Sequence, residues 1–353
     1  MAKIFHVAPY GPNSCGIYEA CRDMMKADVL SGHEVYFVDK GNLKDRKYEF
    51  QPVGTTDDRG GFKVVTSDHR DLDVADIIMA HSLPHNEWLI RNQAPIIFVA
   101  HGRPLYGFRL EYFHEKASFS FLKEYSRFPR IKKLLYFWPE FTPYWESVFP
   151  KDKMLALDYP IIDQVRFSPK GDIHTIKDEQ KGEYNILICD SWREDVDMFE
   201  IFNGALQSAR DYKNIKFHLY AIDTKKGVIN PCWELLIQEM KNLGAMGELC
   251  ARMDNMEQVY RSMDAVLTPH RIITRVIGES LSCGTPVIAD VKCKMAQFGC
   301  DPHDPYSVSD AIGAFIRSDK KHNIKRALKE AKHLDTSTYS KQMNKVYREI
   351  LGV

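Results

Sequence analysis

The chain has 353 residues, of which 44% are hydrophobic and 27% are charged, which is typical of ordinary globular protein and long enough for two domains. Its 48 basic residues balance 48 acidic ones, which excludes a strong global field that would draw the chain to nucleic acid or membrane. No apolar run approaches the ~20 residues of a membrane span. Residues 1–8 resemble a strand rather than a signal peptide, so we expect a cytoplasmic protein.

The first half alternates short apolar runs with longer amphipathic ones, as strands and crossover helices of a parallel sheet do. A glycine-containing loop over residues 9–16 precedes the first predicted helix, and such a loop either lets a ligand approach the backbone or is only a turn. The predicted strands of this half cover residues 4–8, 34–38, 62–65, 76–80, 95–100 and 153–157, and the first helix covers 17–30.

Two of these strands end in histidine, His81 and His101. Because ligands bind beyond the carboxyl ends of parallel strands, either ring could face a ligand. For His81 the sequence favours a structural histidine that bonds backbone groups. For His101 a ligand contact and a structural role are equally open.

Aromatic and basic residues crowd together between residues 103 and 145. Aromatic faces stack on bases or sugars and cations follow phosphates, so this segment is the best candidate for holding an acceptor, with Arg103, Tyr106 and Arg109 at its start. It could also bind a nucleic acid or an anionic membrane surface. The alternative is that most of the rings form the core between helices.

The second half repeats the alternation, and a charged linker around residues 169–182 separates it from the first. We predict an N-terminal domain over residues 1–165, a second domain over 166–335, and a helix crossing between the domains over 336–353. The predicted strands of this half cover 185–189, 215–221, 265–267 and 286–289, with a short one near 249–251, and the helices cover 196–212, 232–243, 256–263, 275–282, 307–316, 323–331 and 337–351.

The stretch from residue 267 to residue 289 runs from a strand through a polar loop into a helix that carries Glu279, and Gly284 ends that helix. A loop that leads into a helix N-terminus at the edge of a parallel sheet offers N–H groups to a phosphate. Arg193 lies in another strand-to-helix loop, where its guanidinium could pair with a phosphate or be neutralised by Glu194 and Asp195.

These features resemble the retaining glycosyltransferases of family 4, which have the GT-B fold. The most specific match is the run Gly278-Glu279-Ser280-Leu281-Ser282-Cys283-Gly284-Thr285-Pro286-Val287, which is similar to the family's Glu-Ala-x-Ala-x-Gly-x-Pro-Val signature. Weaker matches are Gly16-Ile17, Gly32-His33-Glu34-Val35, the strand ending in His101-Gly102, and Arg166-Phe167-Ser168-Pro169.

The resemblance implies an α/β protein with two Rossmann-like domains that face each other across a cleft. It implies that Glu279 binds the ribose of a nucleotide sugar and that the backbone of Thr274, Arg275 and Val276 holds the diphosphate. Arg193 would neutralise the departing phosphate.

On the side of the first domain, the resemblance implies that the loop at Gly16 and Ile17 closes over the donor and that His101 contacts the transferred sugar. The expected enzyme is a hexosyl- or pentosyltransferase that uses a UDP-sugar rather than a GDP-sugar. It would act on a hydroxyl acceptor, with retention and without a metal, and its oligomeric state is open.

One position departs from the family. The family usually has an earlier glutamate that touches the donor sugar and is separated from the later one by seven residues, and here that position is Arg271. Arg271 could select a negatively charged sugar, could stabilise the diphosphate, or could mark the loss of transfer. Three functions follow: a glycosyltransferase, the same chemistry on a hydroxymethylated base in DNA, and a nucleotide-sugar-binding protein without transferase activity.

Overall fold

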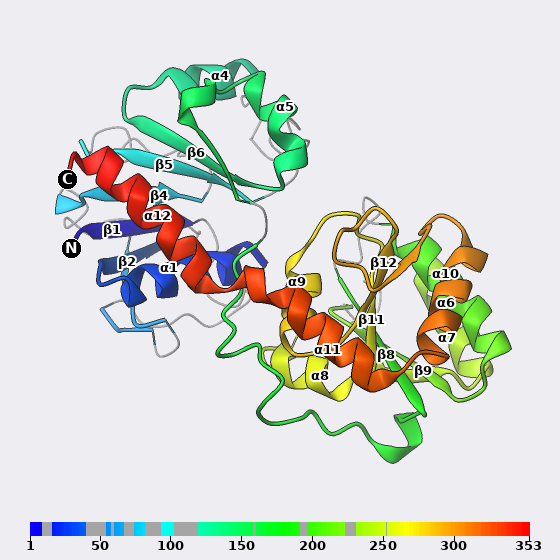
Figure 1. Cartoon of the computed structure of the whole chain (residues 1–353). Coiled ribbons are helices and arrows are strands. Elements are labelled where there is room, and N and C mark those ends of the chain that lie inside the picture. The colour runs from blue at the N-terminus through cyan, green and yellow to red at the C-terminus, as the bar shows by residue number, and fades with distance from the viewer. Residues whose placement is uncertain are drawn as a thin grey trace. The chain divides into compact units, whose positions relative to one another are not determined.

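The computed structural model describes residues 1–8, 16–39, 54–57, 60–66, 74–81, 93–101, 119–157, 160–190, 197–222, 231–251 and 253–353. The chain divides into two compact units. Unit 1 comprises Met1–Ile161 together with Asp335–Val353, and unit 2 comprises Ile162–Leu334. Each unit is built on its own parallel sheet (Figure 1).

The sheet of unit 1 has seven strands in the order β3-β2-β1-β4-β5-β6-β7, and neighbouring strands run parallel. The strand order reverses between β1 and β4, which is the point where ligands bind in sheets of this kind. The strands are β1 (Lys3–Ala8), β2 (Glu34–Asp39), β3 (Lys63–Thr66), β4 (Ile77–Ala80), β5 (Ile96–Ala100), β6 (Ile131–Phe137) and β7 (Met154–Leu157).

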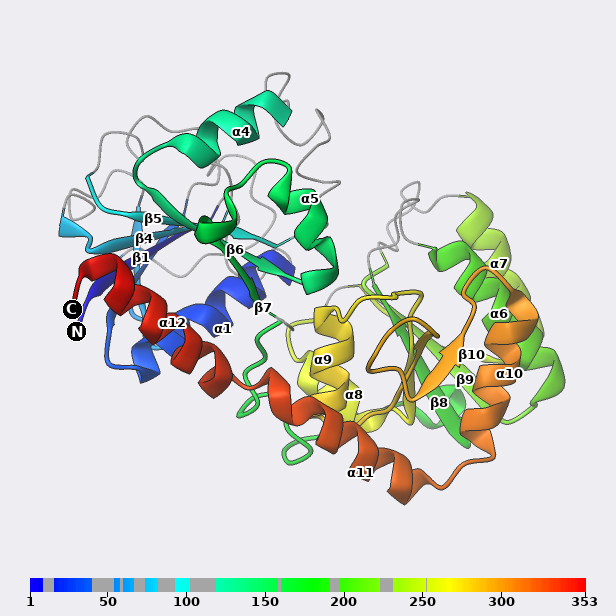
Figure 2. The same ribbon diagram turned by 45° about the horizontal axis from the view of Figure 1, so that its top comes forward.

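The C-terminal helix belongs to unit 1 although it follows unit 2 in the chain, which confirms the predicted crossover. Helix α12 (Thr336–Leu351) lies beside α1 (Gly16–Leu30) in both views (Figures 1 and 2). The Tyr347 hydroxyl donates to the Asp28 carboxylate at 3.0 Å, and the Ser340 hydroxyl donates to a carbonyl of α1. The other α-helices described in this unit are α4 (Phe119–Arg127) and α5 (Thr142–Glu146).

The sheet of unit 2 has six strands in the order β10-β9-β8-β11-β12-β13, and its order reverses between β8 and β11. Helices α6, α7 and α10 cover one face, and α8, α9 and α11 lie on the other (Figure 2). The strands are β8 (Tyr184–Cys189), β9 (Ile215–Tyr220), β10 (Met246–Leu249), β11 (Ala265–Leu267), β12 (Val287–Asp290) and β13 (Phe298–Cys300). The helices are α6 (Met198–Asp211), α7 (Pro231–Asn242), α8 (Met256–Ser262), α9 (Arg275–Ser282), α10 (Pro305–Ile316) and α11 (Lys320–Ala331).

Most predicted elements are confirmed to within a few residues, but the sequence analysis missed β6 and β13 and placed β10 too late in the chain. Strand β6 was missed because it lies in the aromatic and basic segment, whose composition suggested a binding surface. In the described part of that segment the rings of Tyr136, Phe137 and Trp145 are buried, whereas Tyr144 is exposed. Here the rings mainly form core, as the alternative interpretation proposed.

Among the described residues, no helix combines the length and the apolar character needed to cross a bilayer. None of the seven cysteines that the structure describes forms a disulfide.

A buried histidine in unit 2 makes the fold sensitive to acid. His218 on β9 is fully buried, its Nδ1 accepts from the backbone N–H of Glu248 at 3.2 Å, and its Nε2 lies 3.2 Å from the Asn185 side-chain oxygen. Both ring nitrogens therefore have partners that suit the neutral ring. Burial, which outweighs the nearby Glu248 carboxylate, lowers the pKa of His218 to about 4.

We predict that the free energy of unfolding falls less steeply in acid for His218→Gln than for the wild type. Because the folded-state pKa lies below the unfolded value of about 6.5, the unfolded chain binds more protons between pH 6.5 and 4, and stability falls as pH falls through this window. The wild type should lose about 3 kcal/mol more than the variant in urea unfolding at pH 4 relative to pH 7. His303→Gln, at an exposed site, is the control, and parallel pH profiles for wild type and His218→Gln would contradict the assignment.

Candidate functional site

The carboxyl edge of the unit 2 sheet carries a polar pair at the point where the strand order reverses. Asp190 follows β8, His270 lies three residues beyond β11, and these two strands are neighbours in the sheet. His270 Nε2 lies 2.5 Å from Asp190 Oδ2, and both side chains are mostly buried. The pair links the two loops that leave the central strands. Neither residue was a predicted site residue.

Helix α9 begins at this edge with an N-terminus that its own side chains leave uncapped. Thr274 is the N-cap in an extended conformation, and its side chain makes no capping bond. Its Oγ1 is buried without a hydrogen-bond partner in the described structure, and so is Oγ1 of Thr268, directly after β11. The first N–H groups of a helix have no partner within the helix, and together with the helix dipole they favour an anion. Arg275 and Val276 lie in this first turn.

Glu279 follows one turn later on α9 and is only 8% exposed. Tyr260 of α8 donates its hydroxyl to Oε2 at 3.1 Å, and the Arg275 guanidinium contacts Oε1 through Nε at 2.9 Å and Nη2 at 2.7 Å. Burial, assisted by the Glu279 charge, raises the pKa of Tyr260, so the phenol stays a donor. A carboxylate has about four acceptor positions, and these contacts from Tyr260 and Arg275 hold the Glu279 carboxylate in place.

The glycines around Glu279 have structural reasons. A Cβ on Gly278 would lie 3.0 Å from Ile162 and 3.2 Å from Leu334, so any larger residue would require these side chains to shift away from α9. Gly284 has φ +85°, the left-handed conformation in which glycine commonly ends a helix. The signature thus fixes the position of α9 at the sheet edge as well as supplying its carboxylate.

Arg271 is exposed and makes no ion pair with the residues that the structure describes. The two residues after it, Ile272 and Ile273, are buried and anchor the loop. The Arg271 side chain is therefore exposed to solvent, while the buried Ile272 and Ile273 side chains fix the backbone that leads into α9.

In unit 1 the structure places His81 and His101 directly after β4 and β5, at the carboxyl edge of the sheet. His101 is partly buried, and its Nε2 lies 2.6 Å from His81 Nδ1. The His81 ring is buried, as expected for a structural histidine, but its partners are the rings of His6 and His101 rather than backbone groups. Burial, together with those two neighbours, lowers the pKa of His81 well below its usual value.

The structure brings four predicted donor residues together on one helix: Thr274, Arg275, Val276 and Glu279. Gly16 and Ile17 begin α1 in unit 1. The remaining predictions, Arg193, Arg103, Tyr106 and Arg109, fall outside the described residues.

Sequence reasoning missed the partners that orient these groups. Tyr260 lies in a helix preceding the signature, and Asp28 and His6 lie far from His101 in the sequence. The one signal available was position: Asp190 and His270 lie just beyond predicted strand ends, where parallel topology gathers functional side chains.

No model of a protein family matches the chain, and no curated protein sequence matches it. Solved structures do. A glycosyltransferase from Rickettsia africae ESF-5 superimposes with a TM-score of 0.67 at 12% identity, covering 99% of this chain and 98% of that one. Anabaena HepE in complex with UDP-glucose gives 0.66 at 15% identity, covering 99% and 100%.

Sucrose-phosphate synthase from Thermosynechococcus elongatus gives a TM-score of 0.68 at 14% identity, covering 100% of both chains. At these identities the likeness establishes the fold. The chain has the GT-B fold, an α/β architecture of two Rossmann-like domains, as the sequence predicted.

Proposed function

We propose that this protein is a glycosyltransferase that moves a hexosyl or pentosyl group from a UDP-sugar to a hydroxyl acceptor. The observation that carries the proposal is the arrangement on α9: an uncapped helix N-terminus followed, one turn later, by the buried Glu279 carboxylate. The resemblance to family 4 and the likeness to the UDP-glucose complex of HepE support a UDP-sugar donor.

Each part of α9 suits one part of a nucleotide diphosphate. The N–H groups at Thr274, Arg275 and Val276 would bind the diphosphate, because they concentrate positive potential. Glu279 would accept hydrogen bonds from the two ribose hydroxyls, which would replace contacts that Arg275 makes to Oε1 in this structure. The separation of about one helical turn, ~5.4 Å, fits neighbouring groups of one ligand.

The reaction follows from charge. The bond between the anomeric carbon and the phosphate oxygen breaks, and the acceptor oxygen bonds that carbon. The acceptor proton passes to the leaving diphosphate, which gains negative charge. Helix N–H groups and cations fixed in advance stabilise that charge without reorganisation. We propose that Arg193 supplies such a cation, so that no metal is required, and that transfer proceeds with retention, as in family 4.

A protein that binds the donor without transferring it is the second candidate. It is motivated by Arg271, which occupies the place of the family's sugar-contacting glutamate and is exposed. Turnover of a nucleotide sugar with any acceptor would remove this candidate. The DNA-directed alternative gains no support from the described part of the aromatic segment, because its rings are mostly buried.

We predict that UDP stabilises the protein and that Glu279→Ala abolishes this effect. A ligand at a hundred times its dissociation constant adds about 2.7 kcal/mol to the free energy of unfolding, a rise in melting temperature of about 5 °C. A thermal-shift screen of nucleotides and nucleotide sugars measures it. Glu234→Ala, at an exposed position of α7, should keep the full shift. An undiminished shift in Glu279→Ala would refute the ribose assignment.

We predict that Arg271→Glu changes sugar preference more than nucleotide affinity, because the residue occupies the position that contacts the sugar in family 4. Competition between UDP-sugars with neutral and with acidic sugars should shift by about tenfold toward the neutral ones, the effect of about 1.4 kcal/mol. Binding of UDP alone should stay within about twofold. Equal losses for UDP and for all UDP-sugars would instead assign Arg271 to the diphosphate.

A further inference from the structure

A line of buried hydrogen bonds, here called the histidine relay, crosses unit 1 from α12 to the end of β5. The Tyr347 hydroxyl donates to both Asp28 oxygens, at 3.1 and 3.0 Å, and Asp28 Oδ2 lies 3.0 Å from His6 Nε2. His6 Nδ1 lies 2.9 Å from His81 Nε2, and His81 Nδ1 lies 2.6 Å from His101 Nε2. Asp28, His6 and His81 are at most 4% exposed.

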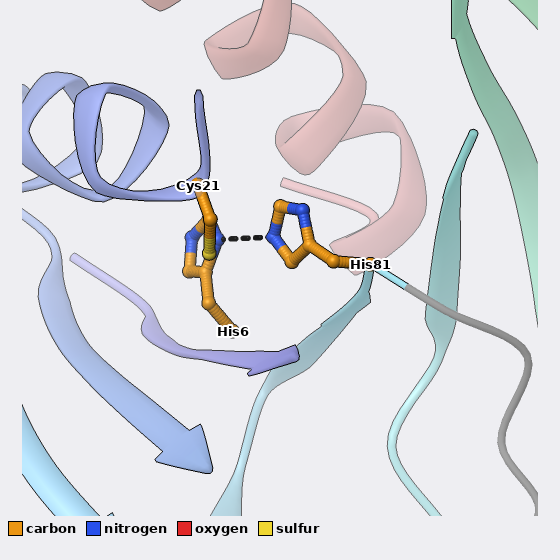
Figure 3. Close-up of side chains that lie close together, drawn as sticks. All are labelled: His6, Cys21 and His81. Carbon is orange, nitrogen blue, oxygen red and sulfur yellow. Dashed lines mark hydrogen bonds between the residues drawn. The ribbon is translucent and has the colours of Figure 1, made fainter. Parts of the chain in front are cut away.

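The three imidazoles meet edge to edge. The ring centroids of His6 and His81 are 5.1 Å apart with planes at 22°, and those of His81 and His101 are 4.9 Å apart with planes at 23°. In each contact the centroid separation nearly equals the N···N distance plus the two ring radii, which is the largest value that the contact allows. The hydrogen bonds therefore lie nearly in the ring planes, the favourable direction for a ring nitrogen. Figure 3 shows the bond between His6 and His81.

The Asp28 carboxylate, at the inner end of the line, determines which ring nitrogen donates in each hydrogen bond. An ionised carboxylate only accepts, so His6 Nε2 carries a hydrogen, and the Nδ1 of a neutral ring then accepts. His81 must therefore donate from Nε2 and accept at Nδ1. His101 must in turn donate from Nε2, and its Nδ1 becomes the acceptor. Each bond fixes the tautomer of the next ring.

The burial of these side chains agrees with neutral rings between an ionised carboxylate and His101. The lowered pKa of His81 keeps that ring neutral, so it has one donor and one acceptor. Burial and the Asp28 charge raise the pKa of Tyr347, which keeps its hydroxyl a donor to the carboxylate.

A metal centre is the competing interpretation, since His6, Cys21 and His81 place ligand atoms within 4.8 Å of one another. Figure 3 shows the Cys21 side chain beside the His6 ring. However, two imidazole nitrogens on one tetrahedral zinc lie about 3.4 Å apart. His6 Nδ1 and His81 Nε2 are closer, at 2.9 Å, which is a hydrogen-bond distance. The two rings therefore form a hydrogen bond with each other rather than bind one metal ion.

We propose that Asp28, His6 and His81 are positioning residues that fix His101 as its Nε2–H tautomer, with Nδ1 as a hydrogen-bond acceptor. Under the proposed function, on which this last step rests, Nδ1 would accept from a hydroxyl of the transferred sugar. Helix α12 takes part through Tyr347, so the C-terminal helix helps to set the chemistry at a sheet edge.

The test is the tautomer of His101 in the ligand-free protein. Two-bond ¹H–¹⁵N correlation spectra of the full chain, assigned with single His→Gln variants, distinguish a protonated from an unprotonated ring nitrogen. We expect His6, His81 and His101 all to carry hydrogen on Nε2. An Nδ1–H tautomer at His101 in the wild type would overturn the proposal. Zinc added alone should leave these signals unchanged, and their loss with stoichiometric zinc would favour the metal centre.

Two variants test the cause. His6→Phe keeps an aromatic ring but removes the acceptor for His81 Nε2–H, and Asp28→Leu removes the carboxylate. In either variant the Nδ1–H tautomer should appear at His101. Met25→Ala removes a buried side chain from the same helix outside the relay, and should leave the tautomer as in the wild type. An unchanged tautomer in a folded His6→Phe protein would refute the relay.

Activity separates this proposal from the proposed function. If the protein transfers sugar, His6→Phe should lower kcat about tenfold, the effect of one hydrogen bond in the transition state, without changing the affinity for UDP. Met25→Ala should not lower kcat at a temperature where it is folded. A wild type without transferase activity but with the expected tautomers would contradict the proposed function and leave the relay intact.

Discussion

The parallel arrangement of strands is the constraint on which the rest of this structure depends. Because all strands of a parallel sheet point the same way, the residues after each strand collect at one edge. In unit 1 this edge gathers His81 and His101 from β4 and β5. In unit 2 it gathers Asp190, His270 and the start of α9 from the two strands where the order reverses. Polar groups far apart in the sequence thereby become neighbours.

A second common feature is that the polar group at each edge is oriented by a buried partner on a helix. Glu279 is held by Tyr260 of α8 and by Arg275 of its own helix. His101 is linked through two further rings to Asp28 of α1, which α12 supports. Buried polar networks of this kind are costly unless every member is satisfied. Their near-complete pairing explains how the edges are pre-organised.

Sequence patterns predicted most of the fold, including α9, the helix of the proposed nucleotide site. Apolar periodicity identified the strands and helices, and the run around Glu279 identified α9. The histidine relay was beyond such reasoning, because the pairing of His6 with Asp28 and His81 depends on sheet register and helix packing between distant segments. Strand β6 was missed because its rings resemble a binding surface until their burial is known.

Helix α9 is proposed to hold the donor nucleotide, and a crystal structure of the protein with UDP tests this most directly. We expect both ribose hydroxyls within hydrogen-bond distance of Glu279, and the diphosphate on the N–H groups of the first turn of α9. UDP bound elsewhere, with Glu279 paired only with Tyr260 and Arg275, would contradict the account. The carboxylate would then be a structural ion pair, and the likeness to glycosyltransferases would extend to the fold alone.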